Sequence, residues 1–100
     1  MSLARIYWFI LVFSEKLCCP ADVRRTAVDV LEPFRYSRVL MGRNPRCIAA
    51  GSLWYSYVLM DEKHPGTLLD WCKAVGVSEN SIGNASRLVA ESWREECGRR

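Results

Sequence analysis

One segment, CIAAGSLWYSYVL at residues 47–59, is apolar around almost its whole helical circumference, and it constrains the fold more than any other part of the chain. Asn44 and Pro45 precede it as a good N-cap and a good first helical residue. A helix without a polar face must be enclosed by its neighbours in a soluble protein. We therefore expect the helix over residues 45–60 to lie at the centre of the fold.

Two more helices are expected before this central one. The first covers about residues 2–17, and the second has Pro20 as its first residue. Pro33 lies inside the apolar pattern of the second helix and should kink or end it near Leu31. For residues 34–41 we expect a last helical turn followed by a loop.

Two further helices are expected after the central one. Thr67 and Asp70 have the spacing of a capping box, and Gly76 marks the end of the helix that they begin. Ser78 caps a fifth helix that continues to about residue 97. No segment is typical of a strand. The prediction is one all-α domain of five helices over residues 1–100, because so short a chain supports only one core.

Positive charge is concentrated in the first half of the chain. Residues 1–50 hold eight Lys or Arg against four acids, whereas residues 51–100 hold six against seven. The stretch from 33 to 60 has no acid, and its basic residues are predicted phosphate contacts: Arg35, Arg38, Arg43 and Arg46. The alternative is a solvated basic patch with no ligand.

The residues that commonly carry catalysis or bind metals form no recognisable pattern. Five irregularly spaced cysteines without Cys-x-x-Cys predict reduced, mostly buried thiols in an intracellular protein, not a zinc site or a disulfide framework. His64, the single histidine, is expected to be a solvated loop residue. No enzyme activity, cofactor or metal is predicted. The apolar run 6–13 is far shorter than the roughly 18 residues of a membrane span, so we expect a buried helix and no membrane partner.

The span from 68 to 88 has the layout of a helix-turn-helix, with Gly76 and Val77 at the turn. Helical periodicity predicts an inward stripe on the second helix, made of Ile82, Ala85, Val89 and Trp93. The outward face carries Asn80, Asn84 and Arg87, side chains that can pair with adenine or guanine in a major groove. Against this, residues 67–97 hold three bases and five acids, whereas DNA readers are usually basic where they dock.

Two motifs resemble the cyclin-like repeat of the transcription initiation factor IIB family. GRNPRCIAAGSLWYS at 42–56 is similar to the family's Gly-Arg-x-Pro-x-x-Ile-Ala-Ala-x-x-Leu-Tyr helix, and AVGVSENSIGN at 74–84 is similar to its helix-turn-helix. LCCPADVRRTA at 17–27 is a weaker third match. The Pro after Gly-Arg and the Gly-Val-Ser turn favour the second repeat of that family.

The resemblance implies a five-helix cyclin-like domain whose C-terminal helix-turn-helix contacts promoter DNA. Carried over by position, the DNA-facing candidates are Ser78, Glu79, Asn80, Ser81, Gly83, Asn84 and Arg87, with Ser78 assigned to phosphate. The prediction is a transcription-related domain that binds duplex DNA weakly and lacks the zinc ribbon and the other repeat. The alternative is a protein-interaction domain that docks on TATA-binding protein or the RNA polymerase machinery, or forms a homodimer. The expected compartment is nuclear in a eukaryote, and cytoplasmic in an archaeon or its virus.

Overall fold

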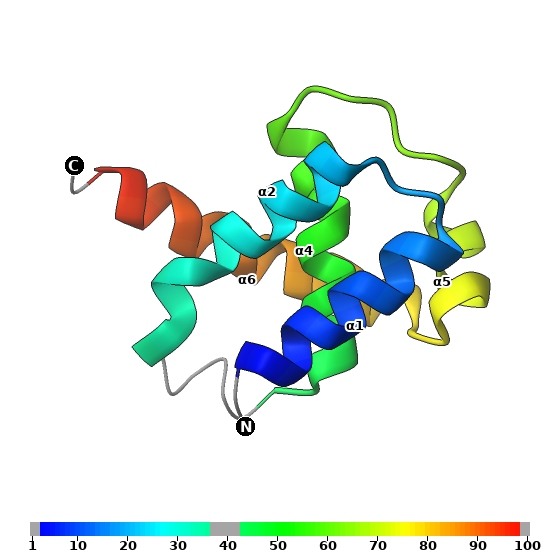
Figure 1. Cartoon of the computed structure of the whole chain (residues 1–100), viewed down its shortest axis with the longest axis horizontal. Helices are drawn as coiled ribbons and strands as arrows, with labels where there is room; N and C mark the ends of the chain where they lie inside the picture. Colours follow the sequence, from blue (N-terminus) through cyan, green and yellow to red (C-terminus); the bar gives the residue numbers. More distant parts are fainter. Residues whose placement is uncertain (1–2, 37–42, 99–100) are drawn as a thin grey trace.

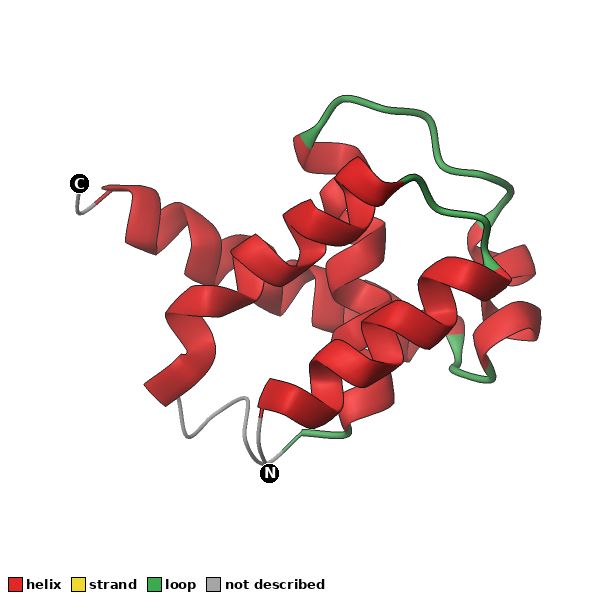
Figure 2. Ribbon diagram, in the orientation of Figure 1, coloured by secondary structure: helices red, strands yellow, loops and turns green. Residues whose placement is uncertain are grey.

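The computed structural model describes residues 3–36 and 43–98. Over these residues it contains only helices, and no strand (Figure 2). The elements are α1 (Leu3–Lys16), α2 (Ala21–Leu31), the 3-10 helix η1 (Glu32–Tyr36), α4 (Pro45–Leu59), α5 (Leu68–Val75) and α6 (Glu79–Gly98). Within residues 3–36 and 43–98, the predicted all-α fold with five α-helices is therefore confirmed.

Helix α4 lies at the centre, as its composition predicts. Figure 1 shows α4 in green, with α1 and α2 on its near side and α6 behind it, and α4 contacts all three. Between Ile48 and Tyr57 every side chain except that of Trp54 is buried. The buried hydroxyls of Ser52 and Ser56 donate to backbone carbonyls one turn earlier, each at 2.7 Å. Burying these two hydroxyls therefore leaves no hydrogen bond unmade.

The helix ends follow the local signals closely. Asn44 caps α4, since its side chain accepts from the Arg46 amide at 2.9 Å, and Gly76 ends α5 with a left-handed φ of 70°. Helix α2 ends at Leu31 and the chain continues as η1, which agrees with the expected effect of Pro33. Pro20 occupies the N-cap, so α2 begins one residue later than predicted.

Two sequence predictions are wrong because tertiary contacts decide them. His64 is half-buried: its ring stacks on Trp54 at 3.6 Å between centroids, and its Nε2 lies 2.9 Å from the Trp54 carbonyl. The cysteines, all free thiols, are not mostly buried. Cys18 and Cys97 are exposed, and Cys19, Cys47 and Cys72 are half-buried at the margins of the core.

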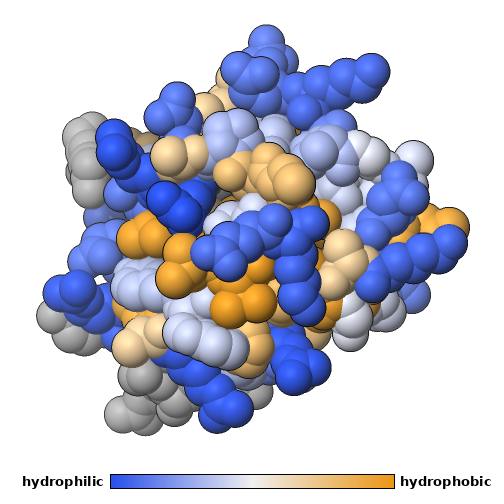
Figure 3. Space-filling view, turned by 45° about the vertical axis from the view of Figure 1, so that its right-hand side comes forward, coloured by the Kyte–Doolittle hydropathy of each residue, from blue (hydrophilic) through white to orange (hydrophobic). Residues whose placement is uncertain are grey.

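Several large apolar side chains of the described residues are exposed although the core is well filled. They are Trp8, Leu11, Val58, Leu59 and Leu69. On the face shown in Figure 3, apolar surface in orange lies in separate areas between hydrophilic side chains. The packing of the single chain does not bury these five side chains.

Candidate nucleic-acid interface

A short turn sets the orientation of α6 against α5. Gly76, Val77 and Ser78 join the two helices, and Val77 is buried in the corner. Trp71 holds α5 in place, because its ring is fully buried and its Nε1 donates to the Pro65 carbonyl at 3.0 Å. The outward face of α6 is thereby fixed relative to the core.

The two faces of α6 follow the predicted division. Ile82, Ala85 and Val89 are buried, whereas Trp93, the last residue of the predicted inward stripe, is only half-buried. The predicted DNA-facing residues of the first half are exposed or half-buried: Glu79, Asn80, Asn84 and Arg87 are exposed, and Ser81 and Gly83 are half-buried.

The amino end of α4 meets the first half of α6, at the edge of its outward face, in a small recess of about 130 Å³. We call it the polar recess; its lining comprises Arg43, Asn44, Cys47, Ile48, Ser81, Asn84, Ala85 and Leu88. The fold thus places Arg43, a predicted phosphate contact, beside Ser81 and Asn84, two predicted base contacts. Residues nearly 40 positions apart in the sequence form one surface.

A second recess, of about 490 Å³, adjoins the first through Arg43 and Asn44. We call it the basic recess, and it is lined by Arg5, Phe9, Arg43, Asn44, Pro45 and Arg46. The amino end of α1 lies beside the start of α4 in Figure 1, which explains why Arg5 and Phe9 contribute. The guanidinium of Arg46 lies over the Phe9 ring, 5.5 Å from its centroid. Three arginines are therefore gathered at one end of α4.

Most of the negative charge of α6 lies away from these recesses. Its acids after Glu79 are Glu91, Glu95 and Glu96, all in the second half of the helix. They follow Asn84 by seven to twelve residues, which is roughly 10–18 Å along a helix rising 1.5 Å per residue. The net charge of −2 over residues 67–97 therefore does not describe the half of α6 that faces the arginines.

Of the remaining predicted phosphate contacts, Arg35 and Ser78 are described, and neither lines the polar or the basic recess. Arg35 lines neither recess, and its guanidinium pairs with Glu32 at 3.2 Å. The same carboxylate accepts from the Tyr7 hydroxyl at 3.4 Å, and burial followed by the Glu32 charge raises the pKa of Tyr7. Arg38 lies outside the described residues. Ser78 caps α6: its hydroxyl accepts from the Ser81 amide at 3.2 Å and donates to the Ser81 hydroxyl at 2.8 Å.

Sequence reasoning missed Arg5 and Phe9, which line the basic recess. Arg5 has a sequence signal, being a single base before an apolar run, but that signal also fits a helix start. Only the packing of α1 on α4 brings Arg5 beside Arg43 and Arg46. Asn44 has an evident local role as the N-cap of α4. The sequence therefore did not indicate that Asn44 also lines both recesses.

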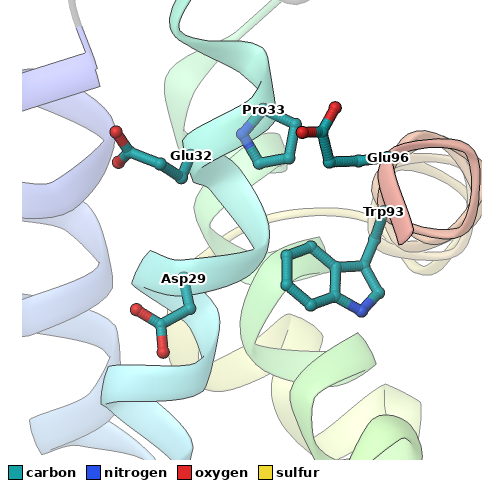
Figure 4. A pocket seen from close by; sticks show the side chains of 5 residues that line it. All are labelled: Asp29, Glu32, Pro33, Trp93 and Glu96. Carbon is teal, nitrogen blue, oxygen red and sulfur yellow. The ribbon is translucent and has the colours of Figure 1, made fainter. Parts of the chain in front are cut away.

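A recess of about 480 Å³ between α2, η1 and α6 has acidic lining but no convergent geometry. Its lining residues are Asp29, Glu32, Pro33, Trp93 and Glu96. In Figure 4 the carboxylates of Asp29 and Glu32 point away from Trp93 and Glu96, so the acids do not share one ligand position. Among the described residues no three His, Cys, Asp or Glu side chains are placed to hold a metal ion. None of the described helices has the length and apolar character that crossing a bilayer requires.

Comparison with known proteins gives no relative. No family model, curated protein or solved structure matches the chain.

Proposed function

We propose that the chain is a transcription-related DNA-binding domain, a single-repeat relative of transcription initiation factor IIB with a cyclin-like arrangement of helices. The observation that carries the proposal is the position of Arg43, which lines both the basic recess and the polar recess. A phosphate-binding cluster and a helix face with base-reading side chains are thus adjacent. The similarity of residues 42–56 and 74–84 to the family supports the same function.

The proposed binding mode places the first half of α6 in a major groove. A B-DNA major groove admits one α-helix, and recognition helices contact bases with their amino-terminal residues. Asn80, Asn84 and Arg87 are exposed on that half of α6, with Glu79 and Ser81 beside them. Arg5, Arg43 and Arg46 would then meet the flanking phosphates, which supply affinity without sequence preference.

Fluorescence anisotropy with labelled promoter-length duplexes at several salt concentrations tests the proposal. Arg43→Ala should weaken all duplexes alike and reduce the slope of log affinity against log salt by about 0.9, the value for one lost phosphate contact. Arg87→Ala should instead flatten the preferences among duplexes, because a good bidentate base contact discriminates by about 1–3 kcal/mol.

Arg94→Ala is the matched control for both variants. Arg94 is an exposed arginine on the same helix, but it lies at the far end, beside Tyr55 and Cys97. Removing it changes the net charge by the same amount as either variant. Because Arg94 lies away from the proposed interface, its removal should leave the salt slope and the preferences among duplexes almost unchanged. Absence of binding by the parent chain to any duplex at low salt would contradict the proposal.

A separate apolar surface favours a second function, self-association as a homodimer. Val58 and Leu59 are 53% and 41% exposed at the carboxyl end of α4. They border a recess of about 360 Å³ whose other lining residues are Tyr55, Trp93, Arg94 and Cys97. Exposed apolar area of this kind is typical of interfaces. This surface is distinct from the two arginine-lined recesses, so dimerisation and DNA binding are compatible.

A further inference from the structure

Trp8 is the one tryptophan of the chain that is largely exposed. Its side chain is 58% exposed on α1, whereas Trp71 is fully buried and Trp54 and Trp93 are half-buried. An indole ring in water forgoes the large burial that usually stabilises a fold. The core of this domain does not use Trp8. A role in binding would explain why so large an aromatic side chain is exposed.

The surroundings of Trp8 are aromatic and strongly basic. Its ring contacts the Phe9 ring edge to face, at 5.2 Å between centroids, and the Arg46 guanidinium lies over the Phe9 ring. Arg5 precedes Trp8 by three residues, a spacing that makes them neighbours on one helical face. We call Arg5, Trp8, Phe9, Arg43 and Arg46 the Arg–Trp surface.

This combination matches the chemistry of an unpaired nucleotide strand. Proteins that hold single strands use a positively charged surface for the phosphates and aromatic rings on which bases stack. The bases of an intact duplex are stacked on one another, so a surface tryptophan reaches a base face only where the strand is unpaired. The three arginines give the phosphates their charge complement, and Trp8 offers the ring.

We infer that the Arg–Trp surface binds single-stranded nucleic acid, with Trp8 stacking on one unpaired base and the arginines holding the adjoining phosphates. The inference rests on the proposed DNA-binding function, because Arg43 and Arg46 belong to both surfaces. It adds a single-stranded ligand to the duplex that the proposed contact through α6 would bind. A nucleic acid with a duplex segment and an adjoining single strand would engage α6 and Trp8 together.

Anisotropy with labelled oligothymidylate and oligouridylate of about 12 nucleotides, within the site sizes of single-strand binding folds, tests the inference. Trp8→Ala should weaken single-strand binding by about 5- to 150-fold, the equivalent of one lost stacking contact. Trp8→Leu should lose as much, because it keeps the apolar bulk but not the ring, whereas Trp8→Phe should retain most of the affinity. The two oligonucleotides distinguish DNA from RNA as the preferred strand.

Leu69→Ala is the control for removing an exposed apolar side chain, since Leu69 is 51% exposed on α5 and absent from the Arg–Trp surface. It should leave single-strand affinity unchanged. Arg5→Ala gives a second readout that spares the ring: it should reduce the single-strand salt slope by about 0.7. Circular dichroism melting of each variant verifies that the fold is intact.

The inference and the proposed function fail in different ways. Duplex binding by the parent chain without single-strand binding would overturn the inference and leave the function standing. Single-strand binding that Trp8→Ala and Trp8→Leu do not weaken would also overturn it, and would make Trp8 a candidate for protein docking. Binding to neither form would overturn both.

Discussion

At the scale of single residues, the capping box of α5 shows how much a local pattern decides. The Thr67 amide donates to the Asp70 carboxylate at 2.8 Å, and the Asp70 amide donates to the Thr67 hydroxyl at 3.2 Å. The hydrogen bond from the Thr67 amide, which favours the charged carboxylate, lowers the pKa of Asp70. The cap is therefore coupled to pH.

Asp70→Ala should lower the melting temperature at neutral pH, and the difference from the parent chain should shrink in acid. A carboxyl whose pKa is lower in the folded state stabilises the fold above its unfolded pKa, and this stabilisation is lost as pH falls through the folded pKa. For Asp70 the loss begins near its ordinary pKa of 3.8 and continues below it. Thermal melts from about pH 7 to pH 2.5 measure this. A difference that stays constant over that range contradicts the role of the charge.

Residue-level predictions succeeded where the cause is local and failed where it is not. Asn44, Thr67 and Gly76 act through neighbours within a few positions, so the sequence contains all that is needed to place them. His64 instead stacks on Trp54, ten residues earlier on another element, and lies 6.0 Å from Trp71. Its burial depends on how the loop after α4 folds back against Trp54, which no local pattern encodes.

At the scale of elements, the crossing of α4 and α6 decides where the candidate interface forms. The helices approach closely at Gly51, where an added Cβ would lie 2.5 Å from the Ala85 Cβ and 2.7 Å from the Ser86 amide nitrogen. That approach sets how near the amino end of α4 comes to Ser81 and Asn84. The glycine is thus part of the architecture of the polar recess.

Gly51→Ala should destabilise the domain by about 1–3 kcal/mol, the usual cost of overpacking, because the backbone of α6 must move away. Gly83→Ala is the matched control on α6 itself. Nothing lies within 4 Å of an added Cβ there, so the better helix propensity of alanine should stabilise the domain by about 0.8–1 kcal/mol. Urea unfolding of both variants gives the two signs. Equal effects would show that the close approach is not needed.

At the scale of the whole molecule, the sequence predicts the helices and their faces but not how distant faces combine. The buried α4 and the two faces of α6 follow from periodicity. The adjacency of Arg5, Arg43 and Arg46 depends on the packing of α1 on α4, whereas Arg35 pairs with Glu32, three residues earlier within η1. Arg35 therefore does not share a surface with Arg43 and Arg46, although all three belong to one acid-free stretch of the sequence.

The whole-molecule prediction concerns the apolar surface at the carboxyl end of α4. Leu59→Glu should convert a dimer to a monomer without changing the helical content, because a charge in an apolar interface loses its water on association. Leu69→Glu, at a similarly exposed site on α5, should leave the dimer intact. Sedimentation at high concentration measures both. A reductant keeps exposed Cys97, which borders the same recess, from forming cross-links.

The outcome also separates the two ways in which the exposed apolar residues can be used. If the parent chain sediments as a monomer at all concentrations, Val58 and Leu59 are not a self-association surface, and the homodimer prediction is wrong. If Leu69→Glu dissociates the dimer and Leu59→Glu does not, the interface lies on α5 instead. Dissociation by Leu59→Glu alone would place the interface on α4 and α6. This interface would lie more than one helical turn beyond the basic end of α4, and it would not include the arginines that the proposed DNA binding requires.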